Sequence, residues 1–247
     1  MKISVVIPAF NEEEVISQTL HEVHLTLLGL EEKKLCSTFE ILVINDGSED
    51  ATAKKVKDFV EEIGEFSEKK ISHIYIYSLV SNQGQMKSLE EGLKRAEGDC
   101  IFTLDADLQD PPELMEEMLN MHIRSGIPCI QAVRKTRAFD SRPKRLSAFL
   151  FYKTVRVICN ARIIEQAADF RLLARREAKI LANFPSEKKA FRLLIPLLKI
   201  PTATIEFDRK ERAAGISKYK YKDQIAFAWD CIFNFNRFRK LNRPFIE

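Results

Sequence analysis

The chain has 247 residues, of which 45% are hydrophobic and 30% charged, and it contains only 8 glycines and 9 prolines. This composition predicts a folded domain with a substantial core and excludes a collagenous, low-complexity or wholly disordered protein. The formal net charge of +3 hides an asymmetry, because residues 1–133 carry 12 Lys and Arg against 25 Asp and Glu while the remainder carries 27 against 11, so we expect the second part to meet an anionic partner.

Five short runs rich in β-branched residues are typical of strands buried in a parallel sheet. They are Met1–Ile7, Phe39–Ile44, Ile71–Leu79, Cys100–Leu104 and Cys129–Val133. Helical segments lie between them, and their starts are predicted by a capping box at Asn11 and Glu14, by caps at Ser48 and Asp50, and by Asp110-Pro-Pro-Glu113 before a helix over 111–123. The first two helices should run toward Leu28 and Ile63. This alternation predicts a doubly wound α/β sheet over about the first 133 residues, with site residues in the loops that follow the strands.

The pattern changes after Val133 to a basic stretch, an apolar helix-like segment over 146–160, and a strand-like run at Thr202–Phe207. Residues 224–240 form a further amphipathic segment, which ends in Arg237, Arg239 and Lys240. No internal repeat or long linker separates these parts. We therefore expect residues 134–247 to complete a single domain as an extension.

The five cysteines are odd in number and follow no metal-binding spacing, so we expect reduced thiols in a cytosolic protein. The N-terminal run MKISVVIPAF is short and is followed at once by NEEE, so we expect no signal peptide. No run of residues approaches the 18 apolar residues of a membrane span.

The sharpest local feature is LDADLQD, residues 104–110, which follows an apolar strand and precedes the proline-started helix. Carboxylates at positions i and i+2, here Asp105 and Asp107, can both reach one divalent cation, and such oxygen ligands suit Mg²⁺ or Mn²⁺ bridging phosphates. The alternative is a solvated turn with a helix cap. The position at a strand end of an α/β sheet, where ligands bind, favours the metal site.

Two other strand ends carry polar residues. In Asn45-Asp46-Gly47-Ser48, Asp46 can accept a hydrogen bond from a base or a ribose, and Gly47 permits a tight turn. Pro8-Ala9-Phe10-Asn11 follows the first strand. Taken alone, each of these segments is more often a structural turn than a site.

In this order and spacing, IPAFNEEE, FEILVINDGSEDAT and SNQGQMKSLEEGLKRAEGDCIFTLDADLQDPPEL resemble the family-2 inverting glycosyltransferases. AVRKTRAFDSRPKR, ADFRLLARR and RAAGISKY are similar to the polyprenyl-phosphate glycosyltransferases, a group that includes dolichyl-phosphate mannose synthases and bacterial undecaprenyl-phosphate glucosyl and aminoarabinosyl transferases. The resemblance covers about residues 3–220. It implies the GT-A fold, a Rossmann-like, doubly wound and mostly parallel sheet. The expected organisation is a transferase domain over 1–220, with a nucleotide-sugar half (1–133) and an acceptor half (134–220), followed by an amphipathic basic segment (221–247).

The resemblance also implies three sets of site residues. The metal would be held by Asp105, Asp107 and Gln109. The nucleotide-sugar would be bound by Pro8, Ala9, Asn11, Glu12, Asp46, Asp105, Ala106, Gln109, Arg212 and Lys218. The acceptor lipid phosphate would be bound by Arg134, Arg137, Ser141 and Arg145, within a stretch, 134–162, that holds nine Lys and Arg against one acid.

The segment ADFRLLARR leaves two roles open for Asp169: an ion pair with Arg171 or Arg175, or a direct catalytic role alongside Asp105 and Asp107. The chain departs from the family's pattern at two places. It has Gln166-Ala167-Ala168 where relatives often show Asp-Ala-Gly, and Ser81 where relatives often carry Arg.

The implied reaction is metal-dependent transfer of a sugar from a UDP- or GDP-sugar to a polyprenyl phosphate with inversion, at the cytosolic face of a membrane, with no nucleic-acid partner. A phosphate monoester is largely dianionic at neutral pH and needs little help from a base. Two alternatives stay open: a family-2 transferase that acts on a saccharide or protein hydroxyl, with Asp169 as general base, and a non-catalytic membrane-associated subunit.

Relatives in this group often carry C-terminal membrane helices, which leaves the mode of membrane association open. Segments 146–157 and 224–240 could rest on the membrane surface, or spans could come from removed sequence or from a membrane-anchoring partner. A homo-oligomer is also open, and both apolar segments could instead be ordinary core helices.

Overall fold

A computed structural model describes residues 1–66, 73–135, 164, 166–185 and 190–208. Seven strands form one sheet in the order β3-β2-β1-β4-β6-β5-β7. They are β1 (Lys2–Ala9), β2 (Thr38–Asn45), β3 (Ile74–Ser78), β4 (Cys100–Thr103), β5 (Cys129–Arg134), β6 (Ala167–Ala174) and β7 (Thr202–Phe207). All neighbouring strands are parallel except β6, which runs antiparallel to both β4 and β5. The predicted mostly parallel α/β sheet is confirmed.

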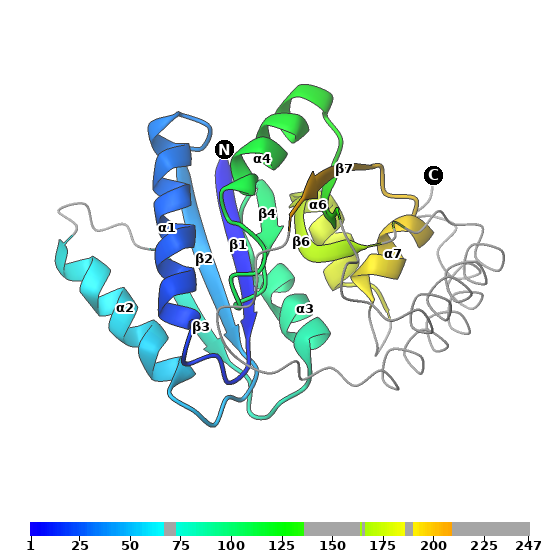
Figure 1. Cartoon of the computed structure of the whole chain (residues 1–247). Helices are drawn as coiled ribbons and strands as arrows, with labels where there is room; N and C mark the ends of the chain where they lie inside the picture. The colour runs from blue at the N-terminus through cyan, green and yellow to red at the C-terminus, as the bar shows by residue number, and fades with distance from the viewer. Residues whose placement is uncertain (67–72, 136–163, 165, 186–189, 209–247) are drawn as a thin grey trace.

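Helices cover both faces of the sheet, as Figure 1 shows. One core lies under α1 (Ile16–Glu32), α2 (Thr52–Phe66) and α4 (Leu114–Ser125), and the other lies under α3 (Gln85–Arg95), α6 (Arg175–Ala182) and α7 (Phe191–Leu197). Successive residues of β1 belong alternately to the two cores, with Val5 in the first and Val6 in the second. The strand is therefore buried on both faces, as its continuous apolar run predicts.

α3 packs closely against the middle of the sheet. A Cβ atom built on Gly92 would lie 2.2 Å from Cγ1 of Val6, so no larger residue fits at this point of α3 without displacing the Val6 side chain. The strand order reverses between β1 and β4, so the carboxyl ends of these two strands lie on the two sides of the switch point. Ligands bind at this place in doubly wound sheets.

The predicted helix starts are only partly correct. α1 begins at Ile16 without a side-chain cap, and Asn11 adopts a left-handed φ of 52° and accepts a hydrogen bond from the Glu49 backbone N–H instead. The capping box is therefore wrong, because the β1–α1 loop is tied to the next loop rather than to its own helix. Asp50 does bind the start of α2, since its Oδ1 accepts from the Thr52 backbone N–H. α4 begins at Leu114, three residues later than predicted.

The strands expected from the sequence are present, but α6 and α7 were not predicted as separate helices. The strand expected over Ile71–Leu79 is β3 at Ile74–Ser78, with residues 71 and 72 outside the described part, and the run at Thr202–Phe207 is β7. Segments 146–160 and 224–240 lie outside the described residues. Among the helices that the structure describes, none is long and apolar enough to cross a membrane.

Candidate active site at the carboxyl ends of the strands

The loop from Asp105 to Asp110 follows β4 and is held by neighbours on both sides. Thr19 of α1 donates its hydroxyl to the Ala106 carbonyl at 2.7 Å. The side-chain amide of Gln85, the first residue of α3, donates to Asp105 Oδ1 at 2.6 Å. Within the loop, the Gln109 backbone N–H donates to Asp107 Oδ1 at 3.1 Å, and Leu108 takes a left-handed φ of 57°. The two carboxylates are thus fixed in place by the surrounding fold.

Asp105 lies in a cluster of negative charge. Burial raises the pKa of its carboxyl well above the usual value, and the charges of Asp169, Asp110 and Asp107 raise it further, whereas Arg134 lowers it. Carboxylates that repel one another in this way, all with hard oxygen atoms, are the donor set that a divalent cation stabilises. Asp105 and Asp107 therefore fit a metal. Among the described residues, no group of three His, Cys, Asp or Glu side chains is arranged to hold an ion unaided.

Asp169 faces this cluster from β6. The antiparallel register pairs Thr103 of β4 with Arg171 of β6, so Asp169, two residues before Arg171, lies near the loop after β4, where its charge acts on Asp105. Thr103 also donates its hydroxyl to the Asp169 backbone carbonyl at 2.6 Å. The antiparallel insertion of β6 thus brings together two carboxylates that are 64 positions apart in the chain.

Two arginines bind the Asp169 carboxylate. Arg171 Nη2 donates to Oδ1 at 2.6 Å, and Arg192 Nη2 of α7 lies 3.3 Å from Oδ2. Burial opposes ionisation of Asp169, but Arg192 and Arg171, helped by Arg134, outweigh it and lower the pKa of this carboxyl. Arg175 binds Asp99 and the Gly98 carbonyl instead. Of the two ion-pair partners predicted for Asp169, Arg171 is therefore confirmed and Arg175 is wrong.

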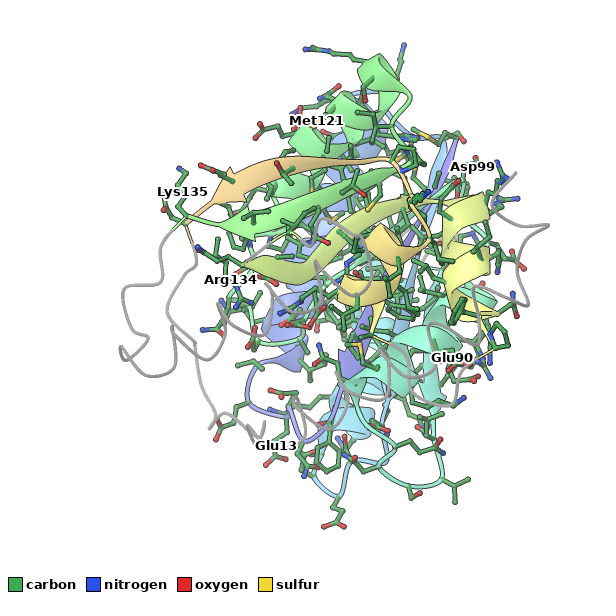
Figure 2. All side chains as sticks on the ribbon, turned by 90° about the vertical axis from the view of Figure 1, so that its right-hand side faces the viewer. Glu13, Glu90, Asp99, Met121, Arg134 and Lys135 are labelled. Atoms are coloured by element: carbon green, nitrogen blue, oxygen red, sulfur yellow. The ribbon has the colours of Figure 1, made fainter. Side chains whose placement is uncertain are left out.

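The loops after β1 and β2 form the other side of the site. Backbone N–H groups of Asn11, Glu12 and Glu13 donate to side-chain oxygens of Ser48, Thr52 and Asp50, respectively. In return, Glu13 Oε2 accepts from the Ala51 backbone N–H. Figure 2 shows Glu13 in this loop region at the bottom of the view. Each loop is braced by the other, so the candidate nucleotide residues Asn11 and Glu12 stand on a fixed backbone.

Asp46 is almost fully buried at the end of β2 and braces a third loop. Its two carboxylate oxygens accept from the backbone N–H groups of Gln83 and Gly84, both at 2.8 Å. Its own backbone N–H donates to the carbonyl of Ala9, which is buried in β1 together with Pro8. In this structure Asp46 organises the loop before α3.

Arg134 ends β5, and its charge acts on the carboxylates of Asp105 and Asp169. Figure 2 shows it at the tip of this strand, on the opposite side of the view from Asp99, which precedes β4. Its side-chain Nε is buried and has no hydrogen-bond partner among the described residues. A buried guanidinium nitrogen of this kind is suited to an anion. The other predicted phosphate ligands, Arg137, Ser141, Arg145, Arg212 and Lys218, lie outside the described residues.

The fold thus brings together most of the predicted site residues that it describes. Asp105, Ala106, Asp107 and Gln109 share one loop, Asp169 and Arg134 flank it, and the Pro8–Glu12 segment and Asp46 lie on the neighbouring strand ends. Two contacting residues, Gln85 and Arg192, were not predicted. Gln85 stands in the quoted SNQGQ motif directly after Gly84, a position that could have identified it, whereas nothing in the sequence marks Arg192.

Comparisons with known proteins agree with this geometry. A family model described as glycosyl transferase family 2 matches residues 4–181. An uncharacterized glycosyltransferase of Bacillus subtilis, YkoT, is 34% identical over 238 residues, which are 95% of this chain and 67% of that protein. The bactoprenol glucosyl transferase of Shigella phage SfV is 33% identical over 219 residues, and a prophage homolog in Escherichia coli is 34% identical over the same length. For both, the match covers 89% of this chain and 67% of the relative.

Solved structures show the same fold. The glucosyl-3-phosphoglycerate synthase of Mycobacterium tuberculosis, in a complex with Mn²⁺, UDP and its product, has a TM-score of 0.62 at 15% identity, covering 95% of this chain and 78% of that one. The mannosyl-3-phosphoglycerate synthase of Rubrobacter xylanophilus has a TM-score of 0.63 at 18% identity, covering 100% and 76%. The predicted GT-A, Rossmann-like architecture is thereby confirmed.

Proposed function

This chain belongs to glycosyl transferase family 2, and we propose that it transfers a sugar from a UDP- or GDP-sugar to a polyprenyl phosphate, with inversion at the anomeric carbon. The observation that carries the proposal is the position of Asp105 and Asp107 in the loop after β4, with Arg134 near Asp105, which would pair a cation site with an anion site. The relatives named for bactoprenol, a polyprenol, support this choice of acceptor.

The donor would lie across the ends of β1, β2 and β4. Asn11 and Glu12 would contact the nucleotide from the braced β1–α1 loop, with Asp46 and the Pro8–Ala9 backbone beneath it. Arg212 and Lys218 would neutralise the donor phosphates from the second part of the chain. Bidentate guanidinium groups and ammonium groups are the usual partners of such oxygens.

Asp105, Asp107 and Gln109 would hold Mg²⁺ or Mn²⁺, with the nucleotide diphosphate completing the coordination. The bound cation supplies Lewis-acid stabilisation of the negative charge that builds on the leaving diphosphate. The protein's part is to hold the two carboxylates in place through Gln85, Thr19 and the Gln109 backbone N–H. The Mn²⁺ complexes of structural neighbours support a divalent ion of this type.

The acceptor phosphate would be bound by Arg134 together with Arg137, Ser141 and Arg145. A phosphate monoester already carries the charge needed to attack the anomeric carbon, so the site must position it rather than deprotonate it. Asp169 fits a site that positions the phosphate without deprotonating it, because both carboxylate oxygens lie against guanidinium groups and the pKa of this carboxyl is lowered. We propose that Asp169 positions cations in this reaction, whereas a hydroxyl acceptor would need it as a general base.

A lipid acceptor requires the enzyme to bind a membrane surface, and we propose that this is the cytosolic face. The 27 Lys and Arg of residues 134–247 against 11 acids would attract anionic lipids, each basic residue near the surface being worth about 1 kcal/mol. Sedimentation with anionic vesicles should detect this binding and its weakening by salt, and a protein that stays in the supernatant at low salt would contradict it. Chemical cross-linking of the vesicle-bound protein would detect an anchoring partner or a homo-oligomer.

A product assay tests the function directly. Radiolabelled UDP- and GDP-sugars are incubated with the purified chain, Mg²⁺ or Mn²⁺, and undecaprenyl phosphate in detergent. Label should move into an organic-extractable product from one of the donors and should require the lipid phosphate. Label transferred to a saccharide or protein hydroxyl, or no transfer to lipid with any donor, would overturn the proposal.

A further inference from the structure

We propose that Asp46 is a positioning residue for the cation site, although β1 separates it from the loop that carries the metal ligands. Through the loop before α3, Asp46 sets the place of Gln85, and Gln85 in turn fixes a carboxylate oxygen of Asp105. The inference rests on the proposed function, since it concerns the cation of that reaction. It gives Asp46 a role toward the metal that its place beneath the nucleotide does not require.

The loop between β3 and α3 has little packing of its own. Residues 80–83 are all exposed, and Val80 is completely so. The last bond between β3 and β2 joins the Leu79 backbone N–H to the Asn45 carbonyl at 2.9 Å. Beyond that bond, the loop is tied to the sheet through two backbone N–H groups that bind Asp46.

Asp46 is a fixed point to which the loop is attached. Only 2% of the residue is exposed, and its backbone N–H donates to the Ala9 carbonyl of β1 at 2.8 Å. Its Oδ1 and Oδ2 each accept one backbone N–H at 2.8 Å, from Gln83 and from Gly84. Hydrogen bonds to an ionised carboxylate are stronger than those between neutral groups. The negative charge also lies at the N-terminus of α3, where the helix dipole favours it.

Gly84 passes this restraint to the helix. Its N–H binds Asp46, while its carbonyl accepts the backbone N–H groups of Lys87 and Ser88 in the first turn of α3. Its φ of 93° is a conformation that a larger residue adopts only with strain. Gln85 follows directly, so its backbone is held from both sides.

The link from Gln85 to Asp105 completes the path, which strand pairing alone does not supply. In the sheet, β1 lies between β2 and β4, so Asp46 and Asp105 follow strands that are not neighbours. The Gln85 side-chain amide bridges them by donating to Asp105 Oδ1 at 2.6 Å. Three other carboxylates repel that of Asp105, so a displaced Gln85 would leave it free to turn away from the position that a cation needs. Partners of a ligating carboxylate orient it in this way.

Four variants of the full chain test the inference: Asp46→Asn, Gln85→Ala, the double variant and Glu40→Gln. Glu40→Gln is the matched control, because Glu40 is also a buried carboxylate of β2 that accepts a backbone N–H, from Glu97, but it lies toward the other end of the strand.

Three measurements are made on each variant. Electron paramagnetic resonance titration of Mn²⁺, with saturating UDP or GDP and no sugar donor, gives metal affinity without turnover. Amide hydrogen exchange over residues 80–89, without any ligand, reports on the loop. Thermal melting checks the fold.

We expect Asp46→Asn to speed amide exchange at Gln83 and Gly84 and to weaken Mn²⁺ binding about ten- to hundredfold, the usual effect of losing a partner behind a metal ligand. Gln85→Ala should weaken Mn²⁺ binding similarly but leave the exchange of the loop nearly unchanged. The double variant should bind Mn²⁺ no more weakly than the weaker single variant, because both residues act along one path. Glu40→Gln should lower the melting temperature and leave Mn²⁺ binding within about twofold of the wild type.

Three results would overturn the inference. The first is unchanged Mn²⁺ binding in Asp46→Asn despite faster exchange, and the second is losses that multiply in the double variant, which would show that Asp46 acts independently of Gln85. The third is a loss of Mn²⁺ binding in Glu40→Gln as large as that in Asp46→Asn, which would indicate general destabilisation. If Asp46→Asn does not fold, Gly47→Ala displaces the same loop and must show the same coupling to Gln85→Ala.

The two proposals fail separately. A wild-type chain that transfers no sugar to lipid phosphate refutes the proposed function, while the Mn²⁺ titrations still decide the role of Asp46. A wild-type chain that transfers the sugar, with an Asp46→Asn variant that binds Mn²⁺ equally well, refutes only the role of Asp46. A wild-type chain that binds no Mn²⁺ with either nucleotide also overturns the inference.

Discussion

Gln85 and Asp105 are joined by a 2.6 Å hydrogen bond that links the first turn of α3 to the loop after β4. A neutral amide donates to a carboxylate that has three other carboxylates acting on it. Gln85 can thereby fix one oxygen of Asp105 and leave the rest of the carboxylate for a cation. Its role is to position Asp105, and it can be tested as such.

Gln85→Ala should lower kcat/KM for the nucleotide-sugar about ten- to hundredfold, because a hydrogen bond to a charged group is worth about 1.5–3 kcal/mol. Gln85→Glu should be worse, since it adds a fifth negative charge. Gln18→Ala, which removes a surface amide that binds Glu22, is the matched control. Steady-state kinetics at several Mn²⁺ concentrations should show a raised metal requirement for Gln85→Ala. An unchanged metal requirement would mean that Gln85 does not act through Asp105.

Asp107→Asn should reduce turnover by about two to three orders of magnitude, because metal stabilisation of the leaving group is worth several kcal/mol. The Gln109 backbone N–H can still donate to an Asn oxygen, so thermal melting should change little. Chelation with EDTA should abolish activity in the wild type, and added Mg²⁺ or Mn²⁺ should restore it. Full activity in excess EDTA would remove the metal from the mechanism.

Gly47→Ala should weaken donor binding by acting through a neighbouring loop. Gly47 has a left-handed φ of 69°, and an added Cβ would lie 2.7 Å from the Ser81 carbonyl carbon and 2.8 Å from the Asn82 nitrogen. The displaced loop carries the backbone N–H groups of Gln83 and Gly84 that bind Asp46. The variant should therefore melt at a lower temperature and show a higher Michaelis constant for the nucleotide-sugar.

Gly29→Ala is the control for that experiment. Gly29 lies inside α1, with nothing within 4 Å of an added Cβ. Alanine there should stabilise the protein by about 0.5–1 kcal/mol through helix propensity and leave the kinetics unchanged. A Gly47→Ala variant that behaves like Gly29→Ala would show that the contact with Ser81 and Asn82 relaxes without cost.

His24 should make the fold sensitive to acid. It is buried on α1 at the edges of the Phe39 and Phe59 rings, and its Nδ1 has no partner among the described residues. Burial, with a smaller effect from His21, lowers the pKa of His24 below its ordinary value of 6.5. The folded state thus binds a proton less readily than the unfolded state, and stability falls as pH drops below about 6.5, by at most about 1.4 kcal/mol per unit.

Urea denaturation between pH 7.5 and 5.5 measures this effect. His24→Phe should flatten the dependence, whereas His21→Gln, a change at an exposed neighbour, should leave most of it in place. Equal slopes for the wild type and His24→Phe would show that other groups govern the acid sensitivity.

The sequence predicted most of the fold because the central strands β1, β2 and β4 are buried on both faces and therefore appear as continuous apolar runs. The loops that carry the site were predicted from the rule that ligands bind at the carboxyl ends of such strands. The order of the strands in space was not predicted. Nothing local in residues 167–174 reveals that β6 is antiparallel and lies between β4 and β5, so the position of Asp169 near Asp105 needed the structure.

Side-chain partners were harder to predict than elements. Asp50 was a correct cap, but Asn11 was not, because a neighbouring loop offered its backbone N–H groups at the same place. Arg171 and Arg175 are equally plausible partners for Asp169 by spacing. On a strand, however, residues two apart lie on the same face, whereas Arg175 starts the next helix and lies at the far end of β6.

The insertion of β6 between β4 and β5 also constrains how the chain can form during synthesis. When residue 134 has been made, β1 through β4 can pair, but β5 has no neighbour in the sheet, because both of its partners, β6 and β7, are still to come. The growing chain therefore exposes one edge of β4 and both edges of β5 until residue 174 has left the ribosome, and one edge of β5 until β7 follows. An open strand edge is a template for wrong pairing, so chaperone binding and aggregation of truncated chains should both concentrate in this interval.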